Sequence, residues 1–372
     1  MNRKLYIDAS YYKEGITGLS RFSDELIDQM MIMKEDKKLV LFCFKNQVVN
    51  VENNLEIIRI NLSISVFTYL TLFFPFVSRW ILKKTFGNSG IIHYHDSIRF
   101  PGDIKGFEAV VTIHDIASLV FPQFYVWRAK ILKKNGLKRL LKSKAKIIAV
   151  SNTTKKDLEN LSKGFIGRID VIGEGVNPNF FIQSSQKFNF SDLIPKEYFL
   201  VVGSPHSRKN YKNIYSAFKK FKESSASNYK LVFVGRAVDR YFKENNIFTE
   251  NFILFKENVS DDDLKSLYYN AFAYVNFSLH EGFGLTILEA MANKCLVIGS
   301  ITTSVGENIG KEGIVASPLN IHEMADSFAY SVCLNEEKRN KLINEAYQKV
   351  LKMNWEVIVT KYYQLFKSID NG

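Results

Sequence analysis

The chain has 372 residues, of which 46% are hydrophobic, 24% are charged and only seven are proline. This composition excludes an intrinsically disordered protein, and the length exceeds one typical domain and is sufficient for two hydrophobic cores. The formal net charge of +12 directs attention to anionic partners, such as a membrane surface or a nucleic acid.

The first predicted elements are a strand at residues 4–8 and a glycine-containing loop behind it. The loop includes Gly15 and Gly18. A Gly-x-x-Gly sequence is a common turn, so by itself it indicates only a tight connection. No signal peptide precedes the strand, and we therefore expect the protein in the cytoplasm. Three widely separated cysteines are consistent with this expectation, because they fit buried thiols in a reducing compartment: Cys43, Cys295 and Cys333.

Residues 60–78 contain no charged side chain and are rich in Phe, Leu and Ile. Arg79 follows directly after them. The segment is long enough to span a membrane. Several Ser and Thr residues lower its hydrophobicity, however, and Pro75 interrupts it. We therefore predict an aromatic helical element at the surface.

Residues 128–146 contain nine Lys or Arg and no Asp or Glu. Together with the apolar residues 60–78, this stretch predicts docking on an anionic membrane leaflet, with the protein peripheral on the inner face of the cytoplasmic membrane. The alternative is an ordinary solvated helix face. Nucleic acid is not an expected partner, because no recognised motif is present and aromatic residues are not interleaved with the cations.

Residues 110–116 read as a buried strand that ends in His114 and Asp115. Ligands of open α/β sheets lie at the carboxyl ends of the strands, so His114 is a candidate site residue. The alternative is a histidine whose hydrogen bonds are satisfied in the core or at the surface.

Short apolar runs alternate with helical patterns through both halves of the chain, which predicts two α/β layers with parallel sheets. The polar stretch at residues 183–196 is the predicted linker. We thus expect a first domain at residues 1–183 and a second at residues 196–353.

A strand that ends near Gly203 precedes a predicted helix, and the connecting loop carries Arg208 and Lys209. Two adjacent cations suit a diphosphate, because they stabilise the charge that a leaving phosphate gains as its bond breaks. The alternative is an exposed pair without a role.

The most informative stretch is residues 280–293, where Glu281 and Glu289 lie eight positions apart around a predicted strand-to-helix turn. Gly282 and Gly284 stand in that turn. The start of a helix beside glycines offers free backbone N–H groups and a partial positive charge, which also suit a diphosphate. Two solvated glutamates are the alternative.

This stretch resembles the E-x7-E signature of retaining glycosyltransferases of family 4, also called glycosyl transferases group 1. Phe-Gly after the first glutamate and Ala-Met-Ala after the second also match the family. The resemblance implies the GT-B architecture, an α/β fold in which two Rossmann-like parallel-sheet domains face each other across a cleft. It also implies that a last helix, at residues 354–372, returns to the N-terminal acceptor domain from the C-terminal donor domain.

The resemblance implies roles for individual residues. Glu281 contacts hydroxyls of the donor sugar, Glu289 holds the ribose and His114 contacts the transferred sugar. The loop after Gly203, with Arg208 and Lys209, holds the diphosphate. The residues expected along the diphosphate in the other loop are Gly282, Phe283, Gly284 and Leu285, and the loop at Gly15 and Gly18 lies near the phosphates or the acceptor.

The sequence therefore predicts a retaining hexosyltransferase that uses a nucleoside-diphosphate sugar, GDP-mannose or a UDP-hexose, and a lipid-linked saccharide acceptor in the synthesis of a surface polysaccharide such as lipopolysaccharide or capsule. His114, Glu281, Arg208 and Lys209 are the predicted catalytic residues. No metal or other cofactor is expected, because cations and a helix dipole take that role. The alternatives are a nucleotide-sugar epimerase of the same two-domain fold and a basic protein that binds membranes or nucleic acid.

Overall fold

The computed structural model describes residues 1–13, 18–33, 38–47, 49, 55–181, 188–225, 227–247 and 249–371. The chain divides into two compact units, which are described separately here. Unit 1 comprises Met1–Gly175 together with Trp355–Gly372, and unit 2 comprises Val176–Asn354. The chain thus leaves unit 1 at Gly175, ahead of the predicted linker. Residues 183–187 of that linker lie outside the described residues.

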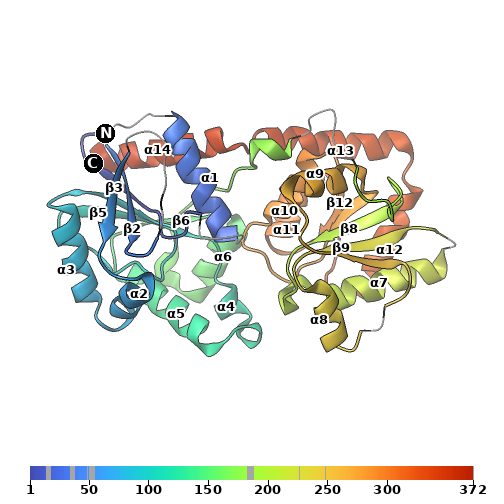
Figure 1. Ribbon diagram of the computed structural model, residues 1–372, viewed down its shortest axis with the longest axis horizontal. Coiled ribbons are helices and arrows are strands. Elements are labelled where there is room, and N and C mark those ends of the chain that lie inside the picture. Colours follow the sequence, from blue (N-terminus) through green and yellow to red (C-terminus); the bar gives the residue numbers. More distant parts are fainter. Residues whose placement is uncertain are drawn as a thin grey trace. The chain divides into compact units, whose positions relative to one another are not determined.

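Unit 1 contains a seven-stranded parallel sheet in the order β3-β2-β1-β4-β5-β6-β7 (Figure 1). Its strands are β1 (Leu5–Asp8), β2 (Leu39–Phe44), β3 (Glu56–Ile60), β4 (Gly90–Tyr94), β5 (Phe107–Ile113), β6 (Lys146–Ala149) and β7 (Ile169–Val171). Its helices are α1 (Gly18–Met33), α2 (Ile64–Phe73), α3 (Pro75–Phe86), α4 (Ala117–Val120), α5 (Trp127–Leu141), α6 (Asn152–Leu161) and α14 (Trp355–Asn371), and short 3₁₀ turns lie at η1 (Pro122–Phe124) and η2 (Lys163–Phe165).

Two hydrophobic cores lie on the two faces of this sheet, because alternate residues of a strand point to opposite faces. Leu5 and Ile7 of β1 pack with residues of α1 and α14, whereas Tyr6 packs with residues of α2, α3 and α5. The C-terminal helix α14 is therefore part of the core of unit 1, with Trp355 and Tyr362 fully buried.

Unit 2 contains a six-stranded parallel sheet in the order β10-β9-β8-β11-β12-β13. Its strands are β8 (Tyr198–Val202), β9 (Lys230–Val234), β10 (Ile253–Lys256), β11 (Ala273–Asn276), β12 (Leu296–Ser300) and β13 (Ile314–Ala316). Its helices are α7 (Tyr211–Ser224), α8 (Val238–Glu244), α9 (Asp261–Asn270), α10 (Leu285–Ala292), α11 (Thr303–Ile309), α12 (Ile321–Cys333) and α13 (Glu336–Leu351), and 3₁₀ turns lie at η3 (Pro178–Phe180) and η4 (Ser207–Lys209).

The core of unit 2 is largely aromatic. Phe199 of β8 contacts Phe218 of α7 and Phe328 of α12, with ring centroids 5.6 and 5.0 Å apart. Both helices thereby cover one face of the sheet. The prediction that all three cysteines are buried is only partly right. Cys43 and Cys295 are buried, whereas Cys333 at the end of α12 is exposed.

Both sheets reverse their strand order next to their first strand, between β1 and β4 in unit 1 and between β8 and β11 in unit 2. The helices that leave such neighbouring strands lie on opposite faces, so their connecting loops leave an opening at the carboxyl edge where ligands bind. The predicted two-domain α/β fold with parallel sheets is thus confirmed. Each sheet has one position where the strand order reverses and where a ligand site is expected.

Candidate functional site

The carboxyl edge of the unit 2 sheet brings together three residues that were predicted to bind the donor. β8 and β11 are adjacent and parallel, with Phe199 opposite Ala273. Arg208 and Lys209 follow β8, and Glu281 follows β11. The three side chains therefore meet where the strand order reverses, although 72 residues separate Lys209 from Glu281 in the sequence.

Glu281 is the centre of this network. Its carboxylate accepts hydrogen bonds from Lys209 Nζ at 2.5 Å, from Ser278 Oγ at 2.8 Å and from the guanidinium of Arg208. Burial raises the pKa of Glu281, but the charges and hydrogen bonds of Lys209 and Arg208 outweigh burial and lower it to about 2. One carboxylate faces two cations, so the network retains positive charge for an anionic ligand.

Hydrogen bonds to backbone carbonyls, one from a backbone N–H and two from side chains, fix the two loops of the network against each other. The N–H of Leu279 donates to the carbonyl of Arg208 at 2.7 Å, and Arg208 in turn donates to the carbonyl of His280 at 2.9 Å. Asn210, which has a left-handed φ of 61°, donates to the carbonyl of Phe277 at 3.1 Å. The cations are thus held in place before any ligand binds, which reduces the reorganisation that binding requires.

The second loop turns into α10 at Gly284, which has a φ of 86° and precedes the first helical residue, Leu285. Gly284 supplies no side chain to cap the helix. Ser304 of α11 supports this turn by donating to the carbonyl of Glu281 at 2.8 Å, and Asn308 donates to the carbonyl of Phe283. Gly282 is half-buried and Phe283 is buried within the same loop.

Glu289 lies in the second turn of α10 and is only 2% exposed. Tyr268 of α9 donates a hydrogen bond to its carboxylate at 3.2 Å. The two glutamates of the motif therefore have different surroundings, since Glu281 faces two cations and Glu289 faces a tyrosine. Gly203 directly follows β8, and its φ of 142° favours glycine while its carbonyl accepts from Tyr211 Oη at 2.6 Å.

In unit 1, His114 stands directly after β5 and contacts Glu174, which follows β7. His114 Nδ1 lies 2.9 Å from Glu174 Oε1, and Glu174 is buried. The ring of Phe22 in α1 packs edge-on against the imidazole at 4.4 Å. Nε2 of His114 has no partner among the described residues. A carboxylate at Nδ1 holds the proton on that nitrogen and leaves Nε2 as the free acceptor.

A second cluster of charges lies where the strand order of unit 1 reverses, and sequence reasoning did not identify it. Arg99 donates to Ser10 Oγ at 2.6 Å and lies 4.0 Å from Asp8 of β1. Asp96 accepts a hydrogen bond from Lys133 of α5 at 2.7 Å. All of these charges are buried and paired. In this unit Gly18 begins α1, and Gly15 lies outside the described residues.

Two further histidines, His93 and His95, are fully buried at the end of β4. Burial lowers the pKa of His93 to about 3 and also lowers that of His95, so both are neutral near neutral pH. Over the described parts of the chain, no group of three or more His, Cys, Asp or Glu is placed to hold a metal ion.

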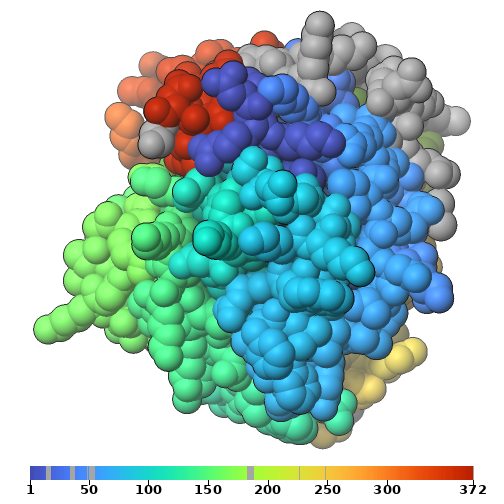
Figure 2. Space-filling model, turned by 90° about the vertical axis from the view of Figure 1, so that its left-hand side faces the viewer, coloured from blue at the N-terminus to red at the C-terminus, as the bar shows by residue number. Residues whose placement is uncertain are grey.

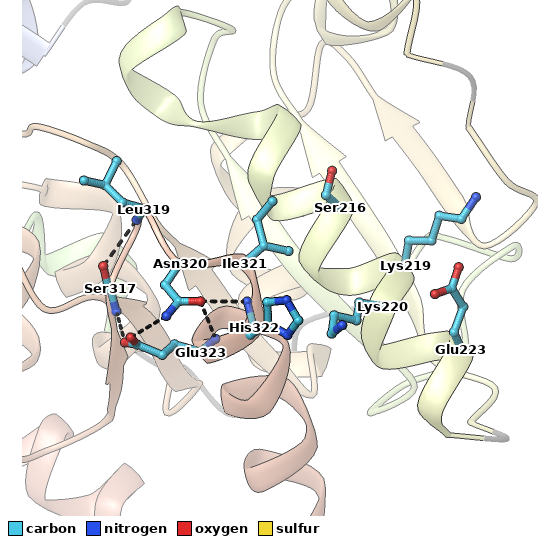
Figure 3. A pocket seen from close by; sticks show the side chains of 10 residues that line it. All are labelled: Ser216, Lys219, Lys220, Glu223, Ser317, Leu319, Asn320, Ile321, His322 and Glu323. Carbon is cyan, nitrogen blue, oxygen red and sulfur yellow. Dashed lines mark hydrogen bonds between the residues drawn. The ribbon is translucent and has the colours of Figure 1, made fainter.

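A hollow of about 740 Å³ in unit 2 lies between α7 and the start of α12 (Figure 3). Lys219, His322 and Glu323 are among its lining residues, and none of the predicted donor-binding residues is. Two of its polar groups pair locally, since Lys219 pairs with Glu250 at 2.9 Å and Asn320 Oδ1 accepts from the N–H of His322 at 3.0 Å. The predicted phosphate-binding residues Arg208 and Lys209 lie instead in the loop after β8.

Comparison with known proteins agrees with the E-x7-E resemblance. Residues 184–349 match the family model described as Glycosyl transferases group 1, and residues 32–180 match the model described as Glycosyltransferase Family 4. The chain therefore belongs to the glycosyltransferase family that these two models describe. Similar proteins include O-antigen chain mannosyltransferase B of Escherichia coli, which is 25% identical over 95% of this chain and 97% of its own length. O-antigen chain mannosyltransferase RfbU of Salmonella typhimurium is 32% identical over 51% of each chain.

Solved structures show the same fold. A sucrose-phosphate synthase from Thermosynechococcus elongatus superimposes with a TM-score of 0.75 over 99% of each chain, at 17% identity. A glycosyltransferase from Rickettsia africae gives a TM-score of 0.68 over 99% of each chain, at 20% identity. This glycosyltransferase therefore has the GT-B architecture, as predicted.

Several contacts of the two sites were not foreseen from the sequence: Ser278, Ser304, Tyr268 and Glu174. Glu174 could have been found from its position three residues after β7, at the same edge of the sheet as His114. Tyr268 and Ser304 come from neighbouring helices, and no spacing in the sequence predicts their contacts.

Proposed function

We propose that this glycosyltransferase moves a hexose, with retention of the anomeric configuration, from a nucleoside-diphosphate sugar to a saccharide acceptor. The observation that carries the proposal is the network of Arg208, Lys209 and Glu281 at the strand ends of unit 2. Two preorganised cations stabilise a diphosphate more as it departs, because its negative charge increases when the glycosidic bond breaks.

The surroundings of Glu281 favour a positioning role over that of a nucleophile or base. Three side-chain donors occupy its carboxylate, and its pKa is about 2. A carboxylate so strongly stabilised is a weak base and a weak nucleophile. We propose instead that the acceptor hydroxyl attacks C1 on the side of the leaving group, while the departing phosphate oxygen takes the hydroxyl proton. Glu281 then orients the cations and the hydroxyl groups of the sugar.

His114 and Glu174 are proposed to act on the transferred sugar. With its Nδ1 proton directed to Glu174, His114 offers Nε2 as an acceptor for a sugar hydroxyl. Neither residue is required to exchange a proton with the reacting bond in this scheme. The proposal needs no metal, because Arg208 and Lys209 supply the positive charge at the phosphates.

GDP-mannose is the donor that we propose first, because two similar proteins are named O-antigen chain mannosyltransferases. UDP-hexoses are the second choice. The names of these relatives also support a role in O-antigen synthesis. We propose that the acceptor is a lipid-linked saccharide in surface-polysaccharide synthesis and that the enzyme works at the cytoplasmic face of a membrane.

The test is a transfer assay with purified protein in the presence of EDTA. GDP-mannose and UDP-hexoses are incubated with and without lipid-linked saccharides, and free nucleoside diphosphate and product are quantified. The proposal predicts release of nucleoside diphosphate only when acceptor is present, and a product whose anomeric configuration, determined by NMR, equals that of the donor. Conversion of one nucleotide sugar into another without acceptor would identify an epimerase instead. An inverted product would overturn the proposed mechanism.

A further inference from the structure

The segment predicted to be an aromatic surface element forms a helical hairpin in unit 1. α2 ends at Phe73, α3 begins at Pro75, and Phe74 joins them. The inner side of the hairpin packs on the sheet through Phe67 and Leu82. Thr71 and Ser78 form a buried hydrogen bond of 3.0 Å between the two helices. The hairpin is therefore a fixed part of the fold and presents one defined outer face.

That outer face is aromatic rather than polar. Five aromatic residues of the hairpin are between 44% and 62% exposed: Tyr69, Phe73, Phe74, Phe76 and Trp80. They include the junction of the two helices, so the tip of the hairpin is its most apolar part. Figure 2 shows the light-blue segment that contains α3 at the surface of the face turned toward the viewer. Soluble proteins seldom expose so many large apolar side chains on one element without a partner.

Cations lie directly beside these aromatic residues. On α3 the outer stripe continues from Phe76 and Trp80 to Lys83 and Lys84, at helical spacing. The ammonium group of Lys84 lies 5.3 Å from the centre of the Trp80 ring. Residues 61–95 contain no Asp or Glu, so no acidic side chain of the hairpin opposes these charges.

The neighbouring helix α5 repeats the pattern. It packs against α2, and Trp127 and Ile131 are exposed near its start, followed at helical spacing by Lys134 and Lys138. α2, α3 and α5 all cover the same face of the sheet, so their outer sides point away from that face together (Figure 1). Aromatic residues followed by lysines thus occur on two adjacent helices of one layer.

The structure narrows the set of basic residues available for docking. Lys133 is buried against Asp96, and Arg139 donates to the carbonyls of Phe100 and Ile98 at 2.7 and 2.9 Å. Both residues stabilise the fold and are not available to a leaflet, contrary to the expectation that the whole basic stretch forms one docking face. Lys134 and Lys138 remain exposed.

We propose that the outer face of α2, α3 and the start of α5 docks on an anionic lipid bilayer, with the aromatic tip of the hairpin inserted at the level of the headgroups. Aromatic rings and lysines with long apolar stems are the side chains that bilayer interfaces favour, and the positive charge complements anionic lipids. No helix among the described residues is long and apolar enough to cross a membrane, so the docking is interfacial. The inference deepens the proposed function, since it identifies the surface through which a lipid-linked acceptor is reached.

A second copy of the chain is the other occupant to consider. An interface between two copies of this surface would bring Lys83 and Lys84 of one copy toward the cations of the other, because a two-fold contact uses the same patch twice. Like charges in an interface oppose association, and no acid within residues 61–95 offsets them. Charge complementarity therefore favours the bilayer.

The test compares the unmodified protein, a hairpin variant and a matched control variant. Their binding to vesicles is measured by co-sedimentation, without any substrate. The hairpin variant combines Phe73→Ser, Phe76→Ser and Trp80→Ser. The matched control combines Ile166→Ser, Ile194→Ser and Leu319→Ser, which removes apolar residues of similar exposure outside the hairpin. The vesicles contain equal parts of phosphatidylcholine and phosphatidylglycerol. The hairpin variant is expected to lose about tenfold or more in partition, and the control to bind like the unmodified protein.

A fluorescence measurement provides a second readout that a folding defect cannot imitate. In Trp127→Phe the remaining tryptophans are the exposed Trp80 and the buried Trp355. Vesicles are expected to shift the emission of this variant to the blue and to allow quenching by brominated lipid. Equal binding of the hairpin variant and the control, or a Trp80 emission that vesicles leave unchanged, would overturn the proposal. Self-association that depends on the hairpin would do so as well, and would identify a second copy as the occupant.

Nucleoside-diphosphate binding is measured on the same three proteins by thermal shift. Unchanged binding in the hairpin variant, with vesicle binding lost, separates the docking surface from the donor site. If the unmodified protein binds nucleoside diphosphate but not vesicles, the docking proposal is wrong and the proposed function is unaffected. If it binds vesicles through the hairpin but binds no nucleoside diphosphate, the proposed function is wrong and the docking surface is unaffected.

Discussion

The two candidate sites of this glycosyltransferase both lie at the carboxyl edge of a parallel sheet, but they differ in their chemistry. In unit 2, loops after two adjacent strands place two cations around one carboxylate, at Arg208, Lys209 and Glu281. In unit 1, the corresponding edge carries a histidine held by a carboxylate, His114 and Glu174, and charges that are already paired inside the protein. Unit 2 thus has an excess of positive charge to offer a ligand, and unit 1 has an oriented imidazole.

This difference indicates that the two units contribute different free-energy terms to the reaction. In the proposed mechanism, unit 2 stabilises charge that develops on the leaving group, a term realised mainly in the transition state. Unit 1 is proposed to orient the sugar, and its exposed aromatic and basic surface is proposed to bring in the acceptor. Variants of the two units should therefore change different kinetic parameters, and the following predictions are ordered by the size of the expected effect.

The largest effect is expected for Lys209→Ala. Loss of this cation removes stabilisation of the departing phosphate, so kcat should fall on the order of 100-fold, as for other preorganised electrostatic groups. Steady-state kinetics with saturating acceptor measures the change. Lys212→Ala, an exposed lysine three residues further on, is the matched control and should be near normal. Near-normal transfer by Lys209→Ala would mean that the phosphate site lies elsewhere.

A smaller effect is expected for Glu174→Ala. Without the carboxylate, His114 loses the partner that fixes its tautomer and orientation, so kcat should fall about tenfold while the donor KM changes little. Glu174→Asp, which retains the charge, should recover part of the rate, and the exposed Glu108→Ala should have no effect. The ¹⁵N chemical shifts of His114 report the tautomer directly. An unchanged tautomer in Glu174→Ala would remove the positioning role.

Glu289→Gln tests the other glutamate of the motif. The proposed ribose contact is made equally in the ground state and the transition state, so its loss should raise the donor KM about tenfold and leave kcat unchanged. The amide retains the size of the side chain and an acceptor for the Tyr268 hydroxyl, which limits the structural change. A donor KM equal to that of the unmodified enzyme would exclude the ribose role.

The smallest expected effect is that of pH on the free energy of unfolding, and the pH range in which stability is lost differs between the units. His93 in unit 1 has its pKa lowered from 6.5 to about 3, so the unfolded chain binds the proton first as the pH falls. The stability that the neutral His93 supplies is complete above pH 6.5 and is lost as the pH falls toward 3, by about 1.4 kcal/mol per pH unit. Glu281 in unit 2, with its pKa lowered from 4.5 to about 2, begins to lose its contribution only below pH 4.5.

Tryptophan fluorescence can follow unit 1 alone, because all three tryptophans, Trp80, Trp127 and Trp355, belong to it. Urea unfolding of unit 1 should shift to lower urea between pH 7 and 5.5. His93→Gln should flatten this dependence, since the variant has one fewer buried group to protonate. A urea midpoint that is independent of pH over this range would contradict the burial argument.

Local chemistry predicted much of the fold. Ser260 caps α9 by accepting from the N–H of Asp263, as its place ahead of three aspartates predicts, and Ser151 caps α6 in the same way. Pro75 begins α3, where the break in the aromatic segment was expected. Gly284 adopts a positive φ at the predicted strand-to-helix turn. In each case the residue type acts within one turn of its own position, so the sequence is sufficient.

Contacts between distant segments were not predictable in this way. Lys133 and Arg139 were expected in the basic docking face, and they are bound instead by Asp96 and by carbonyls after β4. Their burial depends on how α5 packs against the loop after β4, which no periodicity within α5 reveals. The same holds for the partnership of Glu289 with Tyr268, which depends on the packing of α9 against α10.

A thermal-shift titration with GDP and UDP in EDTA, on the unmodified protein and on Lys209→Ala, tests the proposed donor site. Binding to the native state adds RT ln(1 + [L]/Kd) of stability, about 2.7 kcal/mol at 100 times Kd. We expect selective stabilisation of the unmodified protein by one nucleoside diphosphate, and a clearly smaller shift in Lys209→Ala. Stabilisation by neither nucleotide, or an equal shift in both proteins, would contradict a donor site built on Arg208, Lys209 and Glu281.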